Sequence, residues 1–447
     1  MKKVITYGTY DLLHYGHIKL LERAKSLGDY LIVGVTADDF DRTRGKINVQ
    51  QSLMERIEAV RATGIADKII VEEYEGQKID DIKRYNIDIF TVGSDWVGFF
   101  DYLKEFCEVV YLDRTQGVSS SELRAEKREL KIGIIGESSV VMSKFVSECN
   151  YVNGVSVIGI CAQNKQSLSD ALLSLPLVTS EYELLLNQVD AVYVLSHPSM
   201  HYAHVKKALE AGKHVLCESP VTLNLGECQE LFSLAKEKGL VLSDGIKTAY
   251  STAYNRMILL AKGGKIGDIV SVDSICTSLK QVDYTNEAEL EQTWNSLSAW
   301  GPTAMLPIFQ LLGTDYEKKE ILSRVRNEKY KYDEFTKVTF RYPHAVASIK
   351  VGKGVKSEGE LIISGTKGYI YVPAPWWKTD YFELRYELPD NNKRYFYQLD
   401  GEGIRYEIVS FVKAVDNNGI LYIPNNVTLE NTKILEDFCN GNDLYNI

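Results

Sequence analysis

The sequence contains no Cys-x-x-Cys pair, and its seven cysteines are scattered and odd in number. This pattern argues against a disulfide framework or a structural zinc site and is typical of a reducing compartment. No apolar run reaches the length of a membrane-spanning helix, and the N-terminus leads straight into a predicted strand rather than a signal peptide. We therefore expect a cytoplasmic protein that does not bind membranes.

An excess of positive charge is also missing, because the net charge is −10 at pH 7. This balance argues against a surface for nucleic acid or anionic lipid, so any phosphate ligand must meet local positive charge. Repeats and low-complexity segments are absent. The hydrophobic content of 45% and charged content of 25% are typical of a globular protein, and 447 residues predict several domains.

Strand-like and helical patterns alternate over residues 1–128. The predicted strands are Lys3–Tyr7, Tyr30–Thr36, Lys68–Val71, Ile89–Val92 and Val109–Leu112. Such alternation predicts an α/β fold in which a parallel sheet carries helices on both faces. Ligands of these sheets bind at the carboxyl ends of the strands, so the binding residues are expected in the loops there.

The segment after the first predicted strand contains two histidines three residues apart, His14 and His17, at a predicted helix start. A helix N-terminus attracts phosphate, and imidazoles at positions i and i+3 lie on one face. Gly8 permits close approach of a ligand to the backbone, and Thr9 can hydrogen-bond a phosphate. Capping or core histidines, or half of a metal site, are the alternatives.

Three more loops follow predicted strand ends, and each has two interpretations. Residues 42–46 are rich in cations, which suit either a phosphate or a solvated surface. Residues 93–98, Gly-Ser-Asp-Trp-Val-Gly, form either a loop beside a base or polyol or one anchored by a buried tryptophan. Residues 114–121, Arg-Thr-Gln-Gly-Val-Ser-Ser-Ser, make either ordinary helix capping or a second anion site.

These four segments together resemble the glycerol-3-phosphate cytidylyltransferase family over essentially all of residues 1–128. The resemblance implies that CTP is held by Gly8, Thr9, Tyr10, His14, His17, Lys46, Asp95, Arg114, Thr115, Gly117, Val118, Ser119 and Ser120. It implies that the second substrate is held by Asp11, Arg44, Lys78 and Trp96. The family usually has lysine at the position of Arg44, which leaves the acceptor open between glycerol phosphate and a longer alditol phosphate.

The implied reaction is attack by a phosphate-ester oxygen on the α-phosphorus of CTP, with pyrophosphate leaving. His14 and His17 would stabilise the α-phosphate, while Lys46 and Arg114 would hold the triphosphate. We assign no nucleophilic side chain, and Mg²⁺ is the expected cofactor.

A second apolar strand begins at Lys131 and ends in Gly136, which suggests a dinucleotide-binding turn. Residues 190–201 and 208–220, together with a strand-rich tail from about Val338 to Tyr386 and a final helix (Tyr406–Val415), resemble the glucose–fructose oxidoreductase and inositol dehydrogenase family. That family implies a Rossmann domain followed by an α+β domain with a large open sheet, which commonly forms an oligomer interface.

The functional motifs of that family are altered here. Its glycine-rich fingerprint keeps only Gly136, and Glu137 and Ser138 follow. Ala162 falls where an acidic residue would hold the ribose, and Glu-Lys-Pro becomes Glu218-Ser219-Pro220. A serine hydroxyl is a poor substitute for the lysine ammonium as a general acid. The expected Asp-x-Gly-x-His segment is Ala299-Trp300-Gly301-Pro302-Thr303, and Lys247 and His201 are read as structural rather than recruited replacements.

We therefore predict three domains: 1–128, 131–245 and 246–447. The first makes a CDP-polyol for teichoic-acid or other surface-polysaccharide synthesis, and the other two form an oxidoreductase-like half that serves as a scaffold or dimerisation module. The alternative is that this half reduces a ketose phosphate with NAD(P)H to supply the polyol phosphate. In that case the residues Gly136, Ser138, His197 and Glu218 would contact the cofactor.

Overall fold

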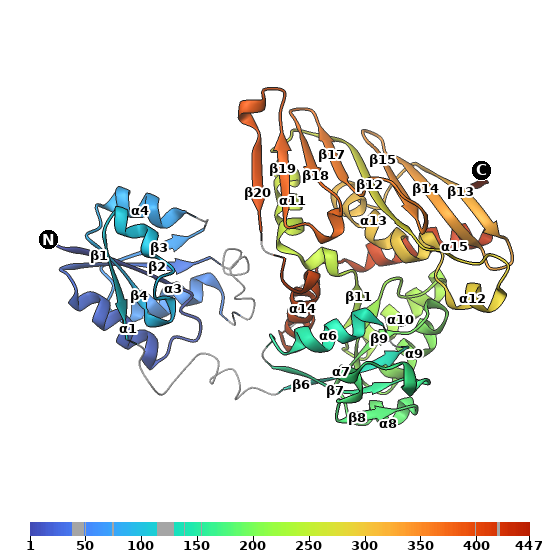
Figure 1. Cartoon of the computed structure of the whole chain (residues 1–447), viewed down its shortest axis with the longest axis horizontal. Coiled ribbons are helices and arrows are strands. Elements are labelled where there is room, and N and C mark those ends of the chain that lie inside the picture. Colours follow the sequence, from blue (N-terminus) through green and yellow to red (C-terminus); the bar gives the residue numbers. More distant parts are fainter. Residues whose placement is uncertain are drawn as a thin grey trace. The chain divides into compact units, whose positions relative to one another are not determined.

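The computed structural model describes residues 1–37, 49, 51–73, 76–113, 129–137, 139–152, 154–397, 399–417 and 421–447. These residues divide into two compact units, Met1–Glu129 and Leu130–Ile447, and each is described by itself (Figure 1). Within the described parts of the chain, every helix is too short or too polar to cross a lipid bilayer. The further boundary that we predict near residue 245 stays a prediction.

The first unit is built on one parallel sheet. Its strands are β1 (Lys3–Gly8), β2 (Tyr30–Thr36), β3 (Lys68–Glu72), β4 (Ile89–Gly93) and β5 (Glu108–Leu112). Its described helices are α1 (Tyr15–Ser26), α3 (Leu53–Ala62), α4 (Gln77–Tyr85) and the short 3₁₀ turns η1 (Ser94–Trp96) and η2 (Asp101–Glu105). The strand order is β3-β2-β1-β4-β5, and all pairs are parallel, which confirms the predicted fold class.

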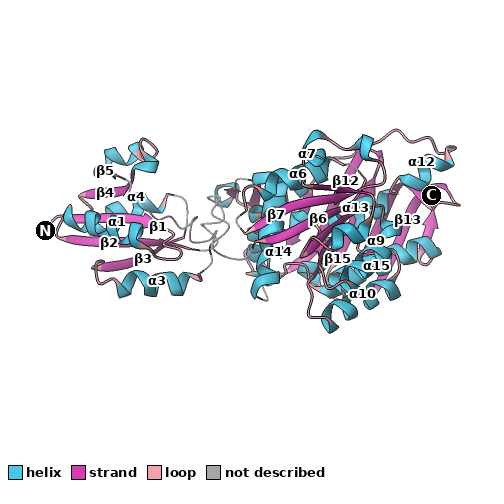
Figure 2. Cartoon of the chain, turned by 90° about the horizontal axis from the view of Figure 1, so that it is seen from below, coloured by secondary structure: helices cyan, strands magenta, loops and turns pink. Residues whose placement is uncertain are grey.

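Alternation along the strands explains the layers of this unit. In β1, Val4 packs against residues of α1 and α3 on one face of the sheet, while Ile5 packs against residues of α4 and η2 on the other. The helices on the two faces are visible in Figure 2. The chain leaves β1 toward β2 on one side and reaches β4 on the other, so β1 lies at the switch point where ligands of such sheets bind.

The second unit opens with another parallel sheet, of order β11-β10-β9-β6-β7-β8. Its strands are β6 (Leu130–Gly136), β7 (Val155–Cys161), β8 (Leu177–Thr179), β9 (Ala191–Leu195), β10 (His214–Glu218) and β11 (Leu242–Gly245). The helices among them are α6 (Val140–Cys149), α7 (Asp170–Leu173), α8 (Tyr182–Leu186), α9 (Pro198–Glu210), α10 (Leu225–Glu237) and the 3₁₀ turn η3 (Lys165–Ser167). Here the switch point lies between β6 and β9.

The rest of the second unit is a ten-stranded mixed sheet of order β20-β19-β18-β17-β12-β15-β14-β13-β21, with β16 paired to β12. Its strands are β12 (Ile269–Leu279), β13 (Lys318–Asn327), β14 (Tyr332–Arg341), β15 (Val346–Gly352), β16 (Gly354–Val355), β17 (Leu361–Gly365), β18 (Tyr369–Val372), β19 (Tyr381–Arg385), β20 (Lys393–Phe396) and β21 (Leu444–Asn446). This sheet confirms the predicted large open sheet.

Helices and short turns complete this half. They are η4 (Lys247–Tyr250), α11 (Thr252–Lys262), α12 (Glu287–Gln292), α13 (Ser296–Leu312), η5 (Trp376–Lys378), η6 (Pro389–Asn391), η7 (Asp400–Gly403), α14 (Ile404–Asn417) and α15 (Asn425–Asn440). The helix α14 is the one predicted at Tyr406–Val415. Two further elements, α15 and β21, lie beyond those predicted from the sequence.

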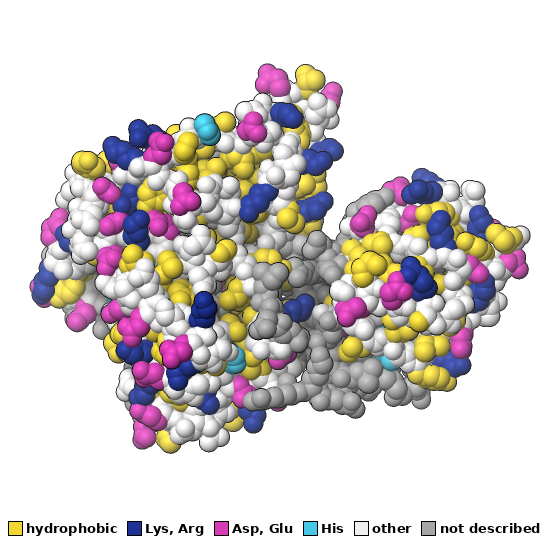
Figure 3. Space-filling model, turned by 180° about the vertical axis from the view of Figure 1, so that it is seen from behind, with side chains coloured by type: hydrophobic (Ala, Val, Ile, Leu, Met, Phe, Trp, Pro, Cys, Tyr) yellow, Lys and Arg dark blue, Asp and Glu magenta, His cyan; other side chains and the backbone are white. Residues whose placement is uncertain are grey.

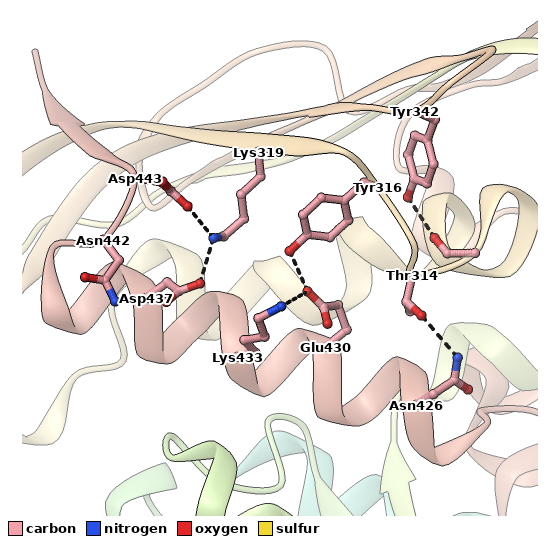
Figure 4. Close-up of polar contacts among 11 residues, drawn as sticks. Thr314, Tyr316, Lys319, Tyr342, Asn426, Glu430, Lys433, Asp437, Asn442 and Asp443 are labelled. Atoms are coloured by element: carbon pink, nitrogen blue, oxygen red, sulfur yellow. Dashed lines mark hydrogen bonds and ion pairs between the residues drawn. The ribbon is translucent and has the colours of Figure 1, made fainter.

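Polar contacts join α15 to the first residues of β13 and to the segment just before that strand (Figure 4). The buried Lys319 ammonium lies 2.7 Å from Asp437 on α15 and 2.6 Å from Asp443, which precedes β21. Burial alone would lower the pKa of Lys319, but the hydrogen bonds that its ammonium donates to both carboxylates outweigh burial and raise that pKa. Nearby, Glu430 accepts a hydrogen bond from Tyr316. The C-terminal segment is therefore an integral part of the large sheet.

Figure 3 shows one face of the molecule, on which lysine, arginine, aspartate and glutamate side chains are interspersed rather than gathered by sign. This distribution agrees with the net charge of −10, and the described residues form no extended basic surface on that face.

Candidate active sites

In the first unit, the two histidines meet at the N-terminus of α1, at the switch point. His14 is the N-cap residue, and its Nδ1 accepts a hydrogen bond from the Gly16 N–H at 3.1 Å. The rings of His14 and His17 stack with centroids 3.9 Å apart and an interplanar angle of 23°. Both side chains are half-buried. The structure therefore brings the pair together on one face, as their spacing predicts.

Tyr10 packs against His17 and so supports the pair of histidines. Its backbone has a φ of 53° and that of Leu12 has 48°, so two non-glycine residues lie in the left-handed region within this short turn. The Tyr10 ring is 1% exposed and meets His17 edge-on at 5.5 Å. A Cβ at Gly8 would lie 3.0 Å from that ring, so glycine is required for this packing. Strain held in place by packing is typical of functional turns.

Two residues that the sequence analysis missed, Gln51 and Arg56, tie the turn to α3. The Gln51 N–H donates to Asp11 Oδ1 at 2.9 Å, and its Oε1 accepts from the Leu12 N–H at 2.8 Å. The fully buried Arg56 donates to the carbonyls of Gln51, Thr9 and Thr36. The available signal was the capping box Ser52-x-x-Glu55, which marks the start of α3 directly after Gln51.

Two of the predicted acceptor residues, Lys78 and Trp96, and the predicted CTP residue Asp95 lie on other elements. Asp95 is exposed on η1 at the end of β4, and Trp96 beside it is half-buried and packs on Phe99 and Phe100. Lys78 is buried on α4, where it pairs with Glu72 at the end of β3. Its ammonium also lies over the rings of Tyr7, at 4.7 Å, and Phe100, at 5.5 Å. The contact of Lys78 with a substrate stays a prediction.

Several predicted residues lie outside the described parts of the chain. They are Arg44, Lys46, Arg114, Thr115, Gly117, Val118, Ser119, Ser120 and, in the second unit, Ser138. The residue before Arg114 is described: the Asp113 carbonyl accepts a hydrogen bond from Arg23 on α1 at 2.7 Å. This bond holds the end of β5 beside the helix that begins at the histidine pair.

In the second unit, Gly136 and His197 follow the two strands at the switch point. Gly136 has a φ of 150°, and a Cβ there would lie 2.5 Å from the Leu195 backbone, so this turn needs glycine as a dinucleotide-binding turn does. His197 caps α9 and packs edge-on against Trp294. Ala162 is buried after β7, where the family carries an acid. The turn fits a dinucleotide, whereas the ribose position lacks its usual carboxylate.

Glu218, Lys247 and Glu407 gather near the ends of β10 and β11. Glu218 accepts hydrogen bonds from the Ser219 N–H at 3.2 Å and the Tyr193 hydroxyl at 3.3 Å. Burial raises the pKa of Glu218 to about 7, although the Lys247 ammonium opposes this shift. Burial also raises the pKa of Glu407, which is 1% exposed on α14, and Glu218 adds to that rise. Perturbed carboxyls around one ammonium mark a candidate acid–base site.

Two further positions bear on acid–base chemistry in this unit: His201 and the segment that replaces the family's Asp-x-Gly-x-His motif. In the structure, side chains at both positions make contacts within the protein. Both ring nitrogens of the fully buried His201 lie 2.7 Å from backbone carbonyls, those of Pro220 and Ser196. Trp300, in the segment that replaces the family's Asp-x-Gly-x-His, lies on α13 and packs on Trp377 at 5.0 Å. His201 is therefore a structural link, as expected, while Lys247 lies beside the raised carboxyls.

The described residues contain no group of three or more histidine, cysteine, aspartate or glutamate side chains that is arranged to hold a metal ion.

Comparison with known proteins matches the two units to two different families. Residues 5–131 match the cytidylyltransferase-like family model, and residues 130–246 match the oxidoreductase family with an NAD-binding Rossmann fold. The glycerol-3-phosphate cytidylyltransferase of Bacillus spizizenii is 49% identical over 130 residues, which are 29% of this chain and 100% of that protein.

The second unit has more distant relatives. The uncharacterized oxidoreductase YhhX of Escherichia coli is 32% identical over 193 residues, which are 42% of this chain and 55% of that protein. The solved structure of KijD10, a 3-ketoreductase from Actinomadura kijaniata, aligns with a TM-score of 0.62 at 18% identity and covers 72% of this chain and 99% of that one. This last likeness shows a shared fold. The chain therefore belongs, through its first 130 residues, to the glycerol-3-phosphate cytidylyltransferase family, and it continues into a domain of the NAD-binding oxidoreductase family.

Proposed function

We propose that the first unit transfers the cytidylyl group of CTP to a polyol phosphate, such as glycerol phosphate, and releases pyrophosphate. The stacked pair of His14 and His17 at the N-terminus of α1 is the observation that carries this proposal. Two imidazoles and a helix N-terminus at the switch point offer donors to one oxyanion. The identity of 49% across the whole length of a glycerol-3-phosphate cytidylyltransferase supports the same activity.

The reaction needs positioning more than covalent chemistry. An oxygen of the acceptor phosphate forms a bond to the α-phosphorus of CTP, and the bond from that phosphorus to pyrophosphate breaks. His14 and His17 would donate to the α-phosphate as charge builds on it, and Lys46 and Arg114 would hold the triphosphate. Arg56 and Gln51 keep the turn in the required conformation by binding Thr9, Asp11 and Leu12.

Mg²⁺ is the metal that we propose for this reaction, since it commonly bridges nucleotide phosphates. The described donors at the turn suit a metal that arrives with the nucleotide. Imidazole nitrogens are poor ligands for Mg²⁺, and Asp11 Oδ1 already accepts the Gln51 N–H. Mg²⁺ would neutralise charge on the phosphates, while the residues of the chain orient them.

The product would be a CDP-polyol for teichoic-acid or other surface-polysaccharide assembly, made in the cytoplasm. We further propose that the chain forms a dimer through the open face of the ten-stranded sheet. The helix α13 packs on β12, β14 and β15. On the opposite face of these strands, side chains such as Asp273 and Ser348 are only half-buried in the single chain.

The test of the first proposal is the substitution His17→Ala, with His344→Ala in the exposed turn before β15 as the matched control. Loss of one transition-state donor should lower pyrophosphate release from CTP and glycerol-3-phosphate by about two orders of magnitude. Circular dichroism and the melting temperature should change little. Activity within fivefold of the wild type would contradict the assigned role, and a screen of other polyol phosphates would identify the acceptor.

A second activity is favoured by one observation in the other unit: Lys247 lies beside Glu218, whose pKa is raised to about 7. We propose that this unit binds NAD(P)H and reduces a ketose phosphate to the polyol phosphate that the first unit consumes. The cofactor would supply hydride, and Gly136 and His197 would line its site. The Glu218 carboxyl, whose pKa is raised to about 7, would protonate the carbonyl oxygen in place of the missing motif lysine. Titration with NADH and NADPH, followed by assays with ketose phosphates, decides between this activity and a scaffold role.

A further inference from the structure

Three lysines from three separate elements of the second unit converge on one carboxylate. The Glu402 side chain lies 2.7 Å from the ammonium of Lys144 on α6 and 2.9 Å from that of Lys378 on η5. The ammonium of Lys247 on η4 lies 3.5 Å away. These lysines pull the pKa of Glu402 down to about 2, against the effect of its partial burial, so this carboxyl is ionised at neutral pH. Three ammonium groups thus face one fixed negative charge.

The loop that carries Glu402 is held in a strained conformation. Gly401, Glu402 and Gly403 have φ values of 57°, 54° and 90°, and the middle residue is not a glycine. A non-glycine residue in the left-handed region costs free energy and is held only by its surroundings. The loop is followed at once by α14, which packs on α6 (Figure 1). Glu148 on α6, which lies against the same loop at Gly401, is paired with Arg405.

The charge and geometry of this cluster suit a phosphate group better than a carboxylate. A phosphomonoester has a charge between −1.5 and −2 at pH 7 and three strong acceptor oxygens, which match three ammonium donors. Glu402 brings one negative charge to three ammonium groups, while Glu218 and Glu407 face Lys247 alone. The N-terminus of α14 adds the positive end of a helix dipole next to the same point.

The lysine cluster shares one residue, Lys247, with the candidate acid–base site. Lys247 comes two residues after Gly245, and Gly245 is the register partner of Glu218 on the neighbouring strand. Lys247 therefore faces Glu218 on one side and Glu402 on the other. A ligand whose phosphate lies among the lysines would place its adjoining carbon atoms toward Glu218.

We propose that Lys144, Lys247 and Lys378 form the phosphate-binding site of the second unit, that Glu402 balances them when no ligand is bound, and that the ligand is a small phosphomonoester. This inference rests on the proposed reductase activity and names its substrate class. It also connects the two units, because a ketose phosphate of that size becomes a polyol phosphate, the kind of acceptor proposed for the first unit.

The experiment measures how inorganic phosphate stabilises the second unit at constant ionic strength. The substitution Trp96→Phe removes the tryptophan of the first unit, and the four others, at positions 294, 300, 376 and 377, all belong to the second unit. Tryptophan emission during heating then reports the unfolding of that unit alone. A ligand that binds the folded state raises the melting temperature according to its concentration and affinity.

Two variants are expected to change the phosphate affinity in opposite directions, which makes the result decisive. Loss of each lysine should weaken phosphate binding about tenfold, so Lys144→Ala/Lys378→Ala should lose about a hundredfold. Glu402→Gln removes the competing carboxylate and should tighten binding about tenfold, even if it lowers the melting temperature without phosphate. Lys262→Ala, at an exposed position ending α11, should match the wild type.

A purely structural ion cluster predicts that Glu402→Gln binds phosphate no better than the wild type, and this result would overturn the proposal. Equal phosphate stabilisation in the double lysine variant and in Lys262→Ala would overturn it as well. Oxidation of NAD(P)H by ketose phosphates is measured in parallel. Phosphate binding with the expected variant effects but without turnover would refute the reductase activity while the phosphate site stands.

Discussion

Arg56 is the residue by which the active-site turn of the first unit can be tested most directly. Its side chain is fully buried and donates to the carbonyls of Thr9 and Thr36, each at 2.8 Å, and of Gln51 at 3.2 Å. Arg56→Met keeps much of the aliphatic volume and removes all of these donors. The three carbonyls then lose their charged partner inside the protein.

A hydrogen bond from a charged donor contributes about 1.5–3 kcal/mol, and neighbouring bonds are not additive. We therefore expect a loss of about 4 kcal/mol in the free energy of unfolding of the first unit, or nearly a factor of 10³ in its opening equilibrium. Cytidylyl transfer should fall as well, because the Thr9 carbonyl belongs to the turn that carries His14 and His17.

Hydrogen exchange followed by mass spectrometry measures this loss in peptides from residues 1–36, separately from the second unit. Arg61→Met on the same helix is the matched control, since Arg61 is exposed and pairs with the exposed Glu58 on the surface. Such a pair contributes less than about 1 kcal/mol. Protection of β1 and β2 in Arg56→Met within tenfold of that in Arg61→Met would refute the reasoning.

Two further predictions concern the second unit. Lys319→Met leaves Asp437 and Asp443 without their buried partner and should lower the free energy of unfolding in urea by about 2–3 kcal/mol. Lys318→Met removes an exposed pair with Glu320 and should lower it by less than about 1 kcal/mol. Equal losses in the two variants would contradict the role given to Lys319. The pKa of Glu218 is raised to about 7 in the folded state, so the folded protein binds more protons than the unfolded chain between about pH 4.5 and 7. The stability contributed by this group is therefore present below that range and is lost as the pH rises through 7. The melting temperature should fall more between pH 5.5 and 8 in the wild type than in Glu218→Gln, and parallel pH profiles would count against the assigned burial.

The sequence by itself determined the elements whose signals are local. Apolar runs that alternate with helical patterns fixed the five parallel strands of the first unit, and the spacing of His14 and His17 placed both imidazoles on one helix face. Gly136 and the altered Glu218-Ser219-Pro220 segment marked a second dinucleotide-type sheet and its departure from the usual motifs. Each of these features depends on neighbours within about ten residues, so periodicity and turn chemistry express them directly.

Only the tertiary structure decided which distant side chains meet. Gln51 and Arg56 support a turn some forty residues earlier, and a capping box gives no sign of that partner. Lys319 reaches Asp437 on a helix that the sequence analysis did not anticipate, because charged and polar residues interrupt its apolar pattern. Glu402 forms ion pairs with lysines from three elements that span more than two hundred residues of the sequence. Contacts of this kind arise from the packing of whole layers, and pairing across such separations leaves no periodic trace in the chain.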